Sequence, residues 1–170
     1  NIKNGKSPGG DGFTVEFYKF FWIDIGHFLV RAINCSYNMT NMSITQSRSL
    51  IKLIPKAHRP RQYLKNWRPI LLLAVDYKIA SSVIANRIKN VLEKIIGESQ
   101  QGFIRGRKIT DNTRFLLDLM VKMNDKNLNG LLLLIDFEKA FDTLHWEFID
   151  RSLQFFNFGP SIRHWIKTFY

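Results

Sequence analysis

The chain has almost no cysteine, since Cys35 is the single copy among its 170 residues. One cysteine cannot form an internal disulfide, and there is no cysteine cluster of the kind that binds structural zinc. The shortage therefore favours a reducing, intracellular setting over an oxidising one.

Long hydrophobic runs are absent as well, because no apolar stretch approaches the length of a membrane span. No signal peptide opens the chain, and there is no initiator methionine. The first ten residues, NIKNGKSPGG, resemble the interior of a protein rather than its beginning. We therefore expect a fragment of a longer protein, with no membrane partner.

Acidic residues are scarce relative to basic ones. The chain has 14 Asp and Glu against 25 Lys and Arg, which gives a formal net charge of +11. This excess favours a polyanionic partner, with nucleic acid ahead of an acidic membrane surface. Hydrophobic residues make up 45% of the chain, including 14 Phe, so the composition is that of a folded domain and not of a disordered one.

The pattern of apolar residues and turn signals predicts an α+β fold rather than a regular βαβ alternation. Asp11 or Thr14 can cap the first helix, and a basic loop joins two strands into a hairpin. The expected helices are 13–37, 76–96, 111–125 and 144–156, with another beginning at Pro160, and the expected strands are 49–55, 70–74 and 131–136.

One carboxylate stands out against its surroundings. Leu131 to Ile135 are all aliphatic, and Asp136 follows them directly. Burying a lone carboxylate is costly, so such a residue needs a partner. An aspartate at the exit of a buried strand can be a magnesium ligand, and it can equally cap the turn that follows.

The residues around Asp136 resemble motif A of reverse transcriptases, in the form found in LINE-type non-LTR retrotransposons. The resemblance rests on LLLIDFEKAFD followed by HWEFI, and it extends in order over nearly the whole chain. KSPGGDGFTVEFYK resembles the amino-terminal segment of non-LTR enzymes, although Gly10 stands where Pro is usual. The fingers motifs are represented by LIPK with NWRPILLL, DYKIASSVIANRI and QQGFIRGRKITDN.

This resemblance implies a role for each residue of motif A. Asp136 would bind two catalytic Mg²⁺ ions, with help from the carbonyl of Phe137. The backbone N–H groups of Lys139 and Ala140 would face the incoming triphosphate. Phe141 would be the steric gate that excludes a 2′-hydroxyl, although it can also be an ordinary core aromatic. Two metals supply the positioning and charge neutralisation that phosphoryl transfer needs.

A basic segment without any acidic residue precedes the second strand. Arg68 follows Trp67 and directly precedes that strand, and its planar guanidinium can grip phosphate oxygens bidentately. The resemblance assigns Arg68 to the α-phosphate of the incoming nucleotide and implies a second cation across the hairpin. Four residues compete for that second role: Lys56, Arg59, Arg61 and Lys65.

The stretch GFIRGR combines glycines, which let backbone approach a ligand, with two cations that can bind phosphate. Alone, this pattern is also common in ordinary turns. Beside the other motifs it resembles a template-facing fingers loop, which would contain Gly102, Phe103, Arg105 and Arg107. Phe103 can either pack under a templating base or fill the core.

The chain lacks the Asp-Asp pair that the second catalytic strand of this family carries. We therefore expect part of a right-hand polymerase, with fingers in 1–130, the start of the palm in 131–170, and the remaining palm and the thumb absent. Alone, this part would be inactive.

The complete domain would use an RNA template, a DNA primer, deoxynucleoside triphosphates and two Mg²⁺ ions, in the nucleus or cytoplasm. The rest of its polyprotein would include an endonuclease. The alternatives are a non-catalytic nucleic-acid-binding remnant and a group II intron maturase.

Overall fold

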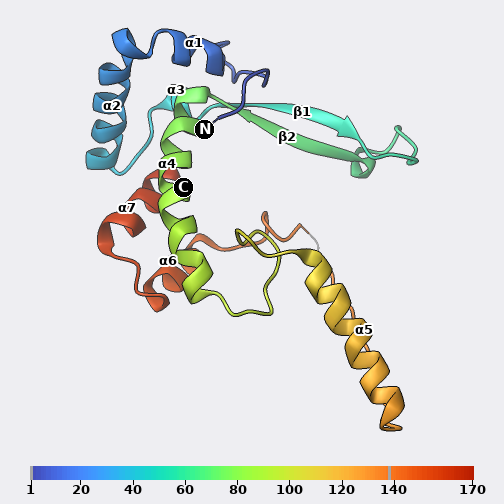
Figure 1. The fold of residues 1–170 in the computed structure, drawn as a ribbon. Coiled ribbons are helices and arrows are strands. Elements are labelled where there is room, and N and C mark those ends of the chain that lie inside the picture. The colour runs from blue at the N-terminus through green and yellow to red at the C-terminus, as the bar shows by residue number, and fades with distance from the viewer. Residues whose placement is uncertain (1, 138) are drawn as a thin grey trace. The chain divides into compact units, whose positions relative to one another are not determined.

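The computed structural model describes residues 2–137 and 139–170, which form a mixture of helices and strands (Figure 1). This mixture is compatible with the expected α+β class. The chain divides into two compact units. The first contains the residues up to Ile84 together with Phe158–Tyr170, and the second contains Ala85–Asn157.

The first unit begins with two helices where the sequence predicts one. The helix expected over 13–37 is interrupted at Phe21, so that α1 (Val15–Phe20) is followed by α2 (Trp22–Met39). Phe21 leaves the helical conformation, with φ −92° and ψ 15°. The break lies within the successive aromatic residues of FFW, and aromatic side chains lose rotamer freedom in a helix, which weakens it there.

Thr14 caps α1, as predicted, because its side chain accepts a hydrogen bond from the backbone N–H of Phe17. The loop before it folds back onto the helix. The N–H of Gly5 donates to Glu16, 2.6 Å away, and this bond lowers the pKa of the Glu16 carboxyl. The ammonium of Lys19 donates to the side chain of Asn4, also at 2.6 Å. The opening loop is therefore held from both ends of α1.

The predicted hairpin is confirmed. β1 (Ser49–Pro55) pairs antiparallel with β2 (Trp67–Leu73), and its loop contains the short 3₁₀ helix η1 (Leu64–Asn66). Pro69 is tolerated because β2 has only one neighbour in this sheet and so needs no donor on its other edge. A short helix, α3 (Ile44–Ser47), precedes β1 and was not predicted, although Ser43 and Gln46 form the capping box that signals it.

β2 leads directly into α4 (Val75–Ile95), and this junction is the most buried part of the first unit. Val75 is only 1% exposed, and Ala74 is buried beside it. Gly9 of the opening loop packs on the same point, since a Cβ built on Gly9 would lie 2.5 Å from the Ala74 nitrogen. Only a residue without a side chain allows this approach.

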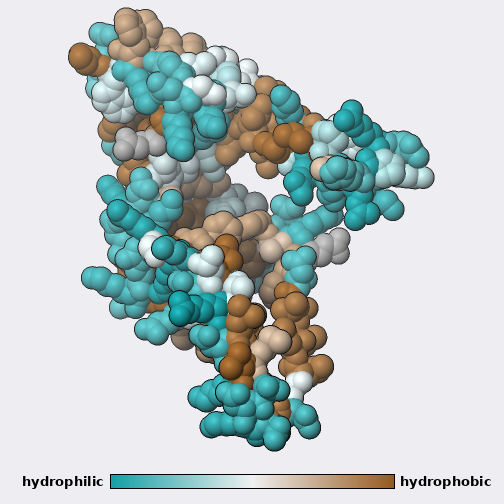
Figure 2. Space-filling view, turned by 45° about the vertical axis from the view of Figure 1, so that its right-hand side comes forward, coloured by the Kyte–Doolittle hydropathy of each residue, from teal (hydrophilic) through white to brown (hydrophobic). Residues whose placement is uncertain are grey.

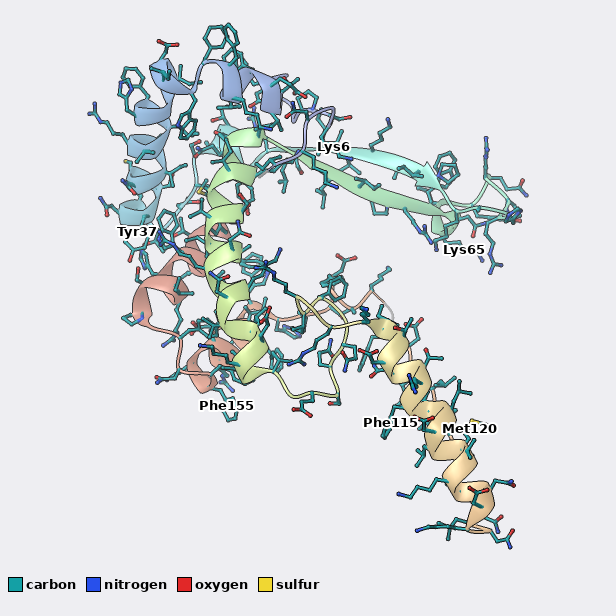
Figure 3. All side chains as sticks on the ribbon, in the orientation of Figure 1. Lys6, Tyr37, Lys65, Phe115, Met120 and Phe155 are labelled. Atoms are coloured by element: carbon teal, nitrogen blue, oxygen red, sulfur yellow. The ribbon has the colours of Figure 1, made fainter. Side chains whose placement is uncertain are left out.

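The first unit is closed by α7 (Pro160–Phe169), which begins at a proline as predicted. Tyr37, at the C-terminal end of α2, contacts both His164 and Trp165 of α7, with ring centroids 4.4 and 4.7 Å apart (Figure 3). The Nε2 of His164 donates to the Tyr37 carbonyl at 2.7 Å. The hydroxyl of Tyr77 in α4 donates to the carbonyl of Phe169, and burial raises the pKa of this tyrosine. Chain segments far apart in sequence are thus packed together.

The second unit contains the C-terminal part of α4, then α5 (Ile109–Asp125) and α6 (Trp146–Phe155). These helices agree with the predicted ranges to within two residues at each end. The helix predicted over 144–156 begins two residues later than expected, because residues 139–143 form turns and a bend before α6.

The strand predicted over 131–136 is wrong. These residues form neither a strand nor a helix, and their side chains are exposed, with Leu131 at 93% and Ile135 at 72%. A strand buried on both faces needs neighbouring strands and covering layers. Among the described residues the only strands are β1 and β2, which pair with each other in the first unit.

Apolar side chains of α5 are exposed too, among them Phe115 and Met120 (Figure 3). Figure 2 shows hydrophobic surface above a hydrophilic tip in the lower part of the view. None of the described helices combines the length and hydrophobicity that crossing a bilayer requires.

The Gly9 contact generates a prediction. Gly9→Ala should lower the free energy of unfolding by about 1–3 kcal/mol, because its methyl group would overlap the backbone of Ala74. Gly10→Ala is the matched control, since a Cβ there meets only the flexible Leu50 side chain, at 3.7 Å. Thermal unfolding of both variants measures the effect. Equal melting temperatures would show that the loop does not pack on this junction.

Candidate nucleic-acid interface

The β1–β2 hairpin has one charged face and one uncharged face. Residues directly opposite each other in an antiparallel pair point to the same side, and so do residues two positions along. Arg68 is opposite Ile54, and Lys52 is opposite Ile70, so Arg68 and Lys52 share a face. The other face has no charged residue between Ser49 and Pro55 or between Trp67 and Leu73. One side of the hairpin can therefore bind an anion.

Lys52 is a residue that the sequence analysis missed. The cations considered as partners for Arg68 all lie in the loop, whereas Lys52 lies within β1, diagonally across from Arg68. The signal that could have found it is the strand register, because the twofold alternation decides which residues share a face. Pairing Ile54 with Arg68 would have placed Lys52 on the same side.

The loop joining the two strands is held in a defined conformation by the residues around Arg68. Trp67 Nε1 donates to the Arg61 carbonyl, and Asn66 Nδ2 donates to the Pro60 carbonyl, both at 2.7 Å. These two bonds give Asn66 and Trp67 a structural role directly before Arg68. Figure 2 shows a hydrophilic surface at the right of the view, where Figure 3 places Lys65 in this loop.

The loop cations differ in how their charge is used. The Lys56 ammonium donates to the Lys65 carbonyl at 2.9 Å, and its backbone N–H donates to the Asn66 carbonyl. The Lys65 ammonium lies 5.5 Å from the centre of the Tyr63 ring. Arg61 is exposed, and its carbonyl receives the Trp67 bond. Lys56 thus helps to shape the loop in this structure, in addition to its predicted role.

In the second unit, the predicted template loop is ordered by its own side chains. Gln100 donates to the Gly102 carbonyl at 3.2 Å, and Gln101 donates to the Glu98 carbonyl at 2.7 Å. Arg107 is half-buried and donates to the carbonyls of four residues: Glu93, Ile96, Gly97 and Gln100. Arg105, in contrast, is exposed. The two arginines of GFIRGR therefore stand in different surroundings.

The structure also brings the template loop to the predicted steric gate. The rings of Phe103 and Phe141 meet edge to face, with centroids 6.1 Å apart and planes at 84°. Both rings are otherwise exposed, Phe103 at 89% and Phe141 at 79%. Phe103 has a left-handed backbone, with φ 64°, which turns the loop at this point. Phe103 and Phe141, which the sequence analysis assigns to the template loop and to the steric gate, are thus neighbours.

The remaining motif A residues lie in an exposed segment. Asp136 and Phe137 are exposed, and a turn follows in which the N–H of Asp142 donates to the Lys139 carbonyl at 2.8 Å. Lys139 has φ 49°, and Ala140 lies within this turn. Glu138, the acidic residue between Phe137 and Lys139, lies outside the described residues.

The described residues do not form a complete metal site. Among them no group of three or more His, Cys, Asp or Glu side chains is arranged to hold an ion. Asp136 provides one carboxylate, which is fewer protein ligands than two metal ions need. Arg68 and the cations of the hairpin loop belong to the first unit, and Asp136 and Phe141 belong to the second.

Comparison with known proteins identifies the relatives of the chain. The family described as reverse transcriptase (RNA-dependent DNA polymerase) matches residues 54–170. The uncharacterized 149 kDa protein of transposon TX1 from Xenopus laevis is 36% identical over 169 residues, which are 99% of this chain and 13% of that protein. The 115 kDa protein of the type-1 retrotransposable element R1DM from Drosophila melanogaster is 29% identical over 150 residues, which are 85% of this chain and 14% of that protein.

Proposed function

Because this chain belongs to the reverse transcriptase family, we propose that it supplies the nucleotide- and template-binding surfaces of an RNA-directed DNA polymerase. One relative is a transposon protein and the other a protein of a retrotransposable element, which confirms the resemblance to LINE-type enzymes and favours it over the group II intron alternative. The chain spans only 13% and 14% of the lengths of these relatives. Polymerase activity of the whole protein is therefore part of what we propose.

The observation that carries the proposal is the charged face of the hairpin. Arg68 and Lys52 on one face can bind the phosphates of an incoming nucleotide, next to a basic loop that includes Lys56 and Arg61. Guanidinium and ammonium groups neutralise phosphate charge, which phosphoryl transfer depends on. Residues 1–130 would act as the fingers of a right hand, and 131–170 as the start of its palm.

Reverse transcriptases generally use divalent metal ions, and we propose Mg²⁺ here. Asp136 would contribute one carboxylate, since a hard cation prefers oxygen ligands. The other carboxylates would come from the rest of the palm, outside the residues that this chain contributes. The template would be RNA, the primer DNA and the substrates deoxynucleoside triphosphates. The thumb and an endonuclease would belong to the same polyprotein.

The hairpin face leads to a prediction about binding. Residues 1–170 should bind single-stranded RNA with an affinity that falls roughly tenfold or more between about 50 and 200 mM salt, since each neutralised phosphate contributes about −0.7 to the slope of log affinity against log salt. Lys52→Gln should remove about 0.7 from this slope. Filter binding across salt measures it. Lys167→Gln, which removes the same charge from α7, is the control, and an unchanged slope for Lys52→Gln would exclude contact between this face and RNA.

A second prediction concerns Asp136. In a longer protein that joins this chain to a complete palm, Asp136→Asn should reduce DNA synthesis on the order of a thousandfold or more, because the near-isosteric amide lacks the charge that metal binding needs. Template binding should persist. Primer extension measures the rate, and Asp142→Asn, in the turn that follows, should remain close to wild type. Substantial synthesis by the Asp136→Asn protein would rule out the metal role.

A third prediction concerns the gate. In the same longer protein, Phe141→Val should reduce discrimination against ribonucleotides roughly tenfold or more, since a smaller side chain leaves room for the 2′-hydroxyl. Single-nucleotide extension with matched deoxy and ribo substrates measures the ratio. Phe155→Val, at an exposed phenylalanine of α6, is the matched control (Figure 3). If both variants discriminate as the wild type does, Phe141 is only a packing residue.

A further inference from the structure

Arg107 occupies an unusual position for a residue in a basic, nucleic-acid-facing motif. Its Nη1 donates to the carbonyls of Gly97 and Gln100, at 2.6 and 2.8 Å. Its Nη2 donates to the carbonyls of Ile96 and Glu93, at 2.9 and 3.3 Å. Both terminal nitrogens are therefore used within the protein, so the side chain has little capacity left for a phosphate.

The carbonyls that Arg107 binds lie at the end of α4 and in the loop after it. The last carbonyls of a helix have no partner within the helix, and the helix end carries a partial negative charge. The guanidinium of Arg107 provides hydrogen-bond donors for these carbonyls and a positive charge next to the helix end. Arg107 itself lies at the far end of the loop. It therefore ties the beginning of the segment 96–107 to its end.

This tie sets the position of Arg105. The N–H of Arg107 donates to the Ile104 carbonyl at 3.3 Å, which closes a turn around Arg105 and Gly106. Gly106 has φ 79°, a conformation that suits glycine. The turn leaves Arg105 exposed while Arg107 is half-buried. One arginine of the motif faces the solvent because the other faces the helix end.

We propose that Arg107 is a positioning residue for nucleic-acid binding, which holds the loop so that Arg105 binds the phosphate backbone of single-stranded RNA. This inference rests on the proposed function and assigns different tasks to two arginines that the sequence motif presents as equivalent. Arg105 supplies charge to the ligand. Arg107 fixes the conformation of the loop, because its guanidinium donates hydrogen bonds to carbonyl oxygens.

The test compares substitutions that keep or remove charge at each arginine. Lysine keeps the charge but lacks the planar fork needed to bind several carbonyls. Residues 1–170 and four variants, R105K, R105Q, R107K and R107Q, are titrated with a single-stranded RNA oligonucleotide across salt. R105K should keep the salt slope of the wild type, because it keeps the charge that neutralises a phosphate, and R105Q should lose about 0.7 from that slope. R107K and R107Q should both bind roughly tenfold more weakly, because the loop loses its charge-assisted hydrogen bonds and must be ordered on binding, but with an unchanged slope, because Arg105 still meets the phosphate in the complex.

Hydrogen exchange provides a second measurement that does not depend on RNA. The amides of 96–107 should exchange faster in R107K than in R105K, because only the first variant loses the tie. If R107K fails to fold, which circular dichroism detects, Gln100→Ala replaces it, since this change removes the bond to the Gly102 carbonyl and no charge. That variant should also weaken binding without changing the slope.

Two results would overturn the proposal. In the first, R107K binds like wild type and R107Q loses about 0.7 from the slope of log affinity against log salt. This result would mean that Arg107 itself contacts phosphate. Wild-type binding by both Arg107 variants would mean that the loop position is irrelevant. A failure of the proposed function is distinct from these, because then the wild-type chain itself would not bind RNA at any salt. The Arg107 inference would fall with it.

Discussion

The close packing of the Gly9 backbone on Ala74 is the constraint on which the first unit depends. Ala74 is the single residue between β2 and α4, so whatever holds it also sets the directions of the hairpin and the helix. Few apolar residues are buried among those described, and Val75 at this junction is the most buried of them. Burial of Tyr18 in α1, with the charges of Asp76 and Asp11, raises the pKa of its hydroxyl to about 12. The loop, α1, the hairpin and α4 are therefore organised around one point.

Much of this fold could be predicted from local signals. Thr14, Pro160 and the two apolar runs around the basic loop predict helix starts and a hairpin, because caps, prolines and turns act over a few residues. The strand at 131–136 was predicted wrongly because a run of aliphatic residues indicates burial, while burial requires partners that the run does not specify. The Arg107 bonds could not be predicted either, since they join residues up to 14 positions apart in sequence. To predict that Lys52 shares a face with Arg68, the strand register must be known. The register follows from the pairing of the two strands and not from either strand alone.

The basic residues of the chain are of two kinds, and the net charge does not distinguish them. Lys56 and Arg107 direct their charge at backbone carbonyls, which lack a partner at loop and helix ends. Arg105, Arg68 and Lys52 are exposed. A formal charge of +11 therefore overstates the charge available to a polyanion. Conversely, a loop that must bind a phosphate backbone needs a defined shape, and cations that bind carbonyls provide it while keeping the local potential positive.

The exposed run from Leu131 to Ile135 has a consequence for the behaviour of the chain in solution. It contains five consecutive aliphatic residues without a charge or a proline, and no described residue pairs with its backbone as a strand. Such a segment is a template for cross-β pairing, since an identical run on a second molecule offers the same unpaired groups and the same apolar faces. Ordered self-assembly through this run is therefore the expected behaviour of the isolated chain.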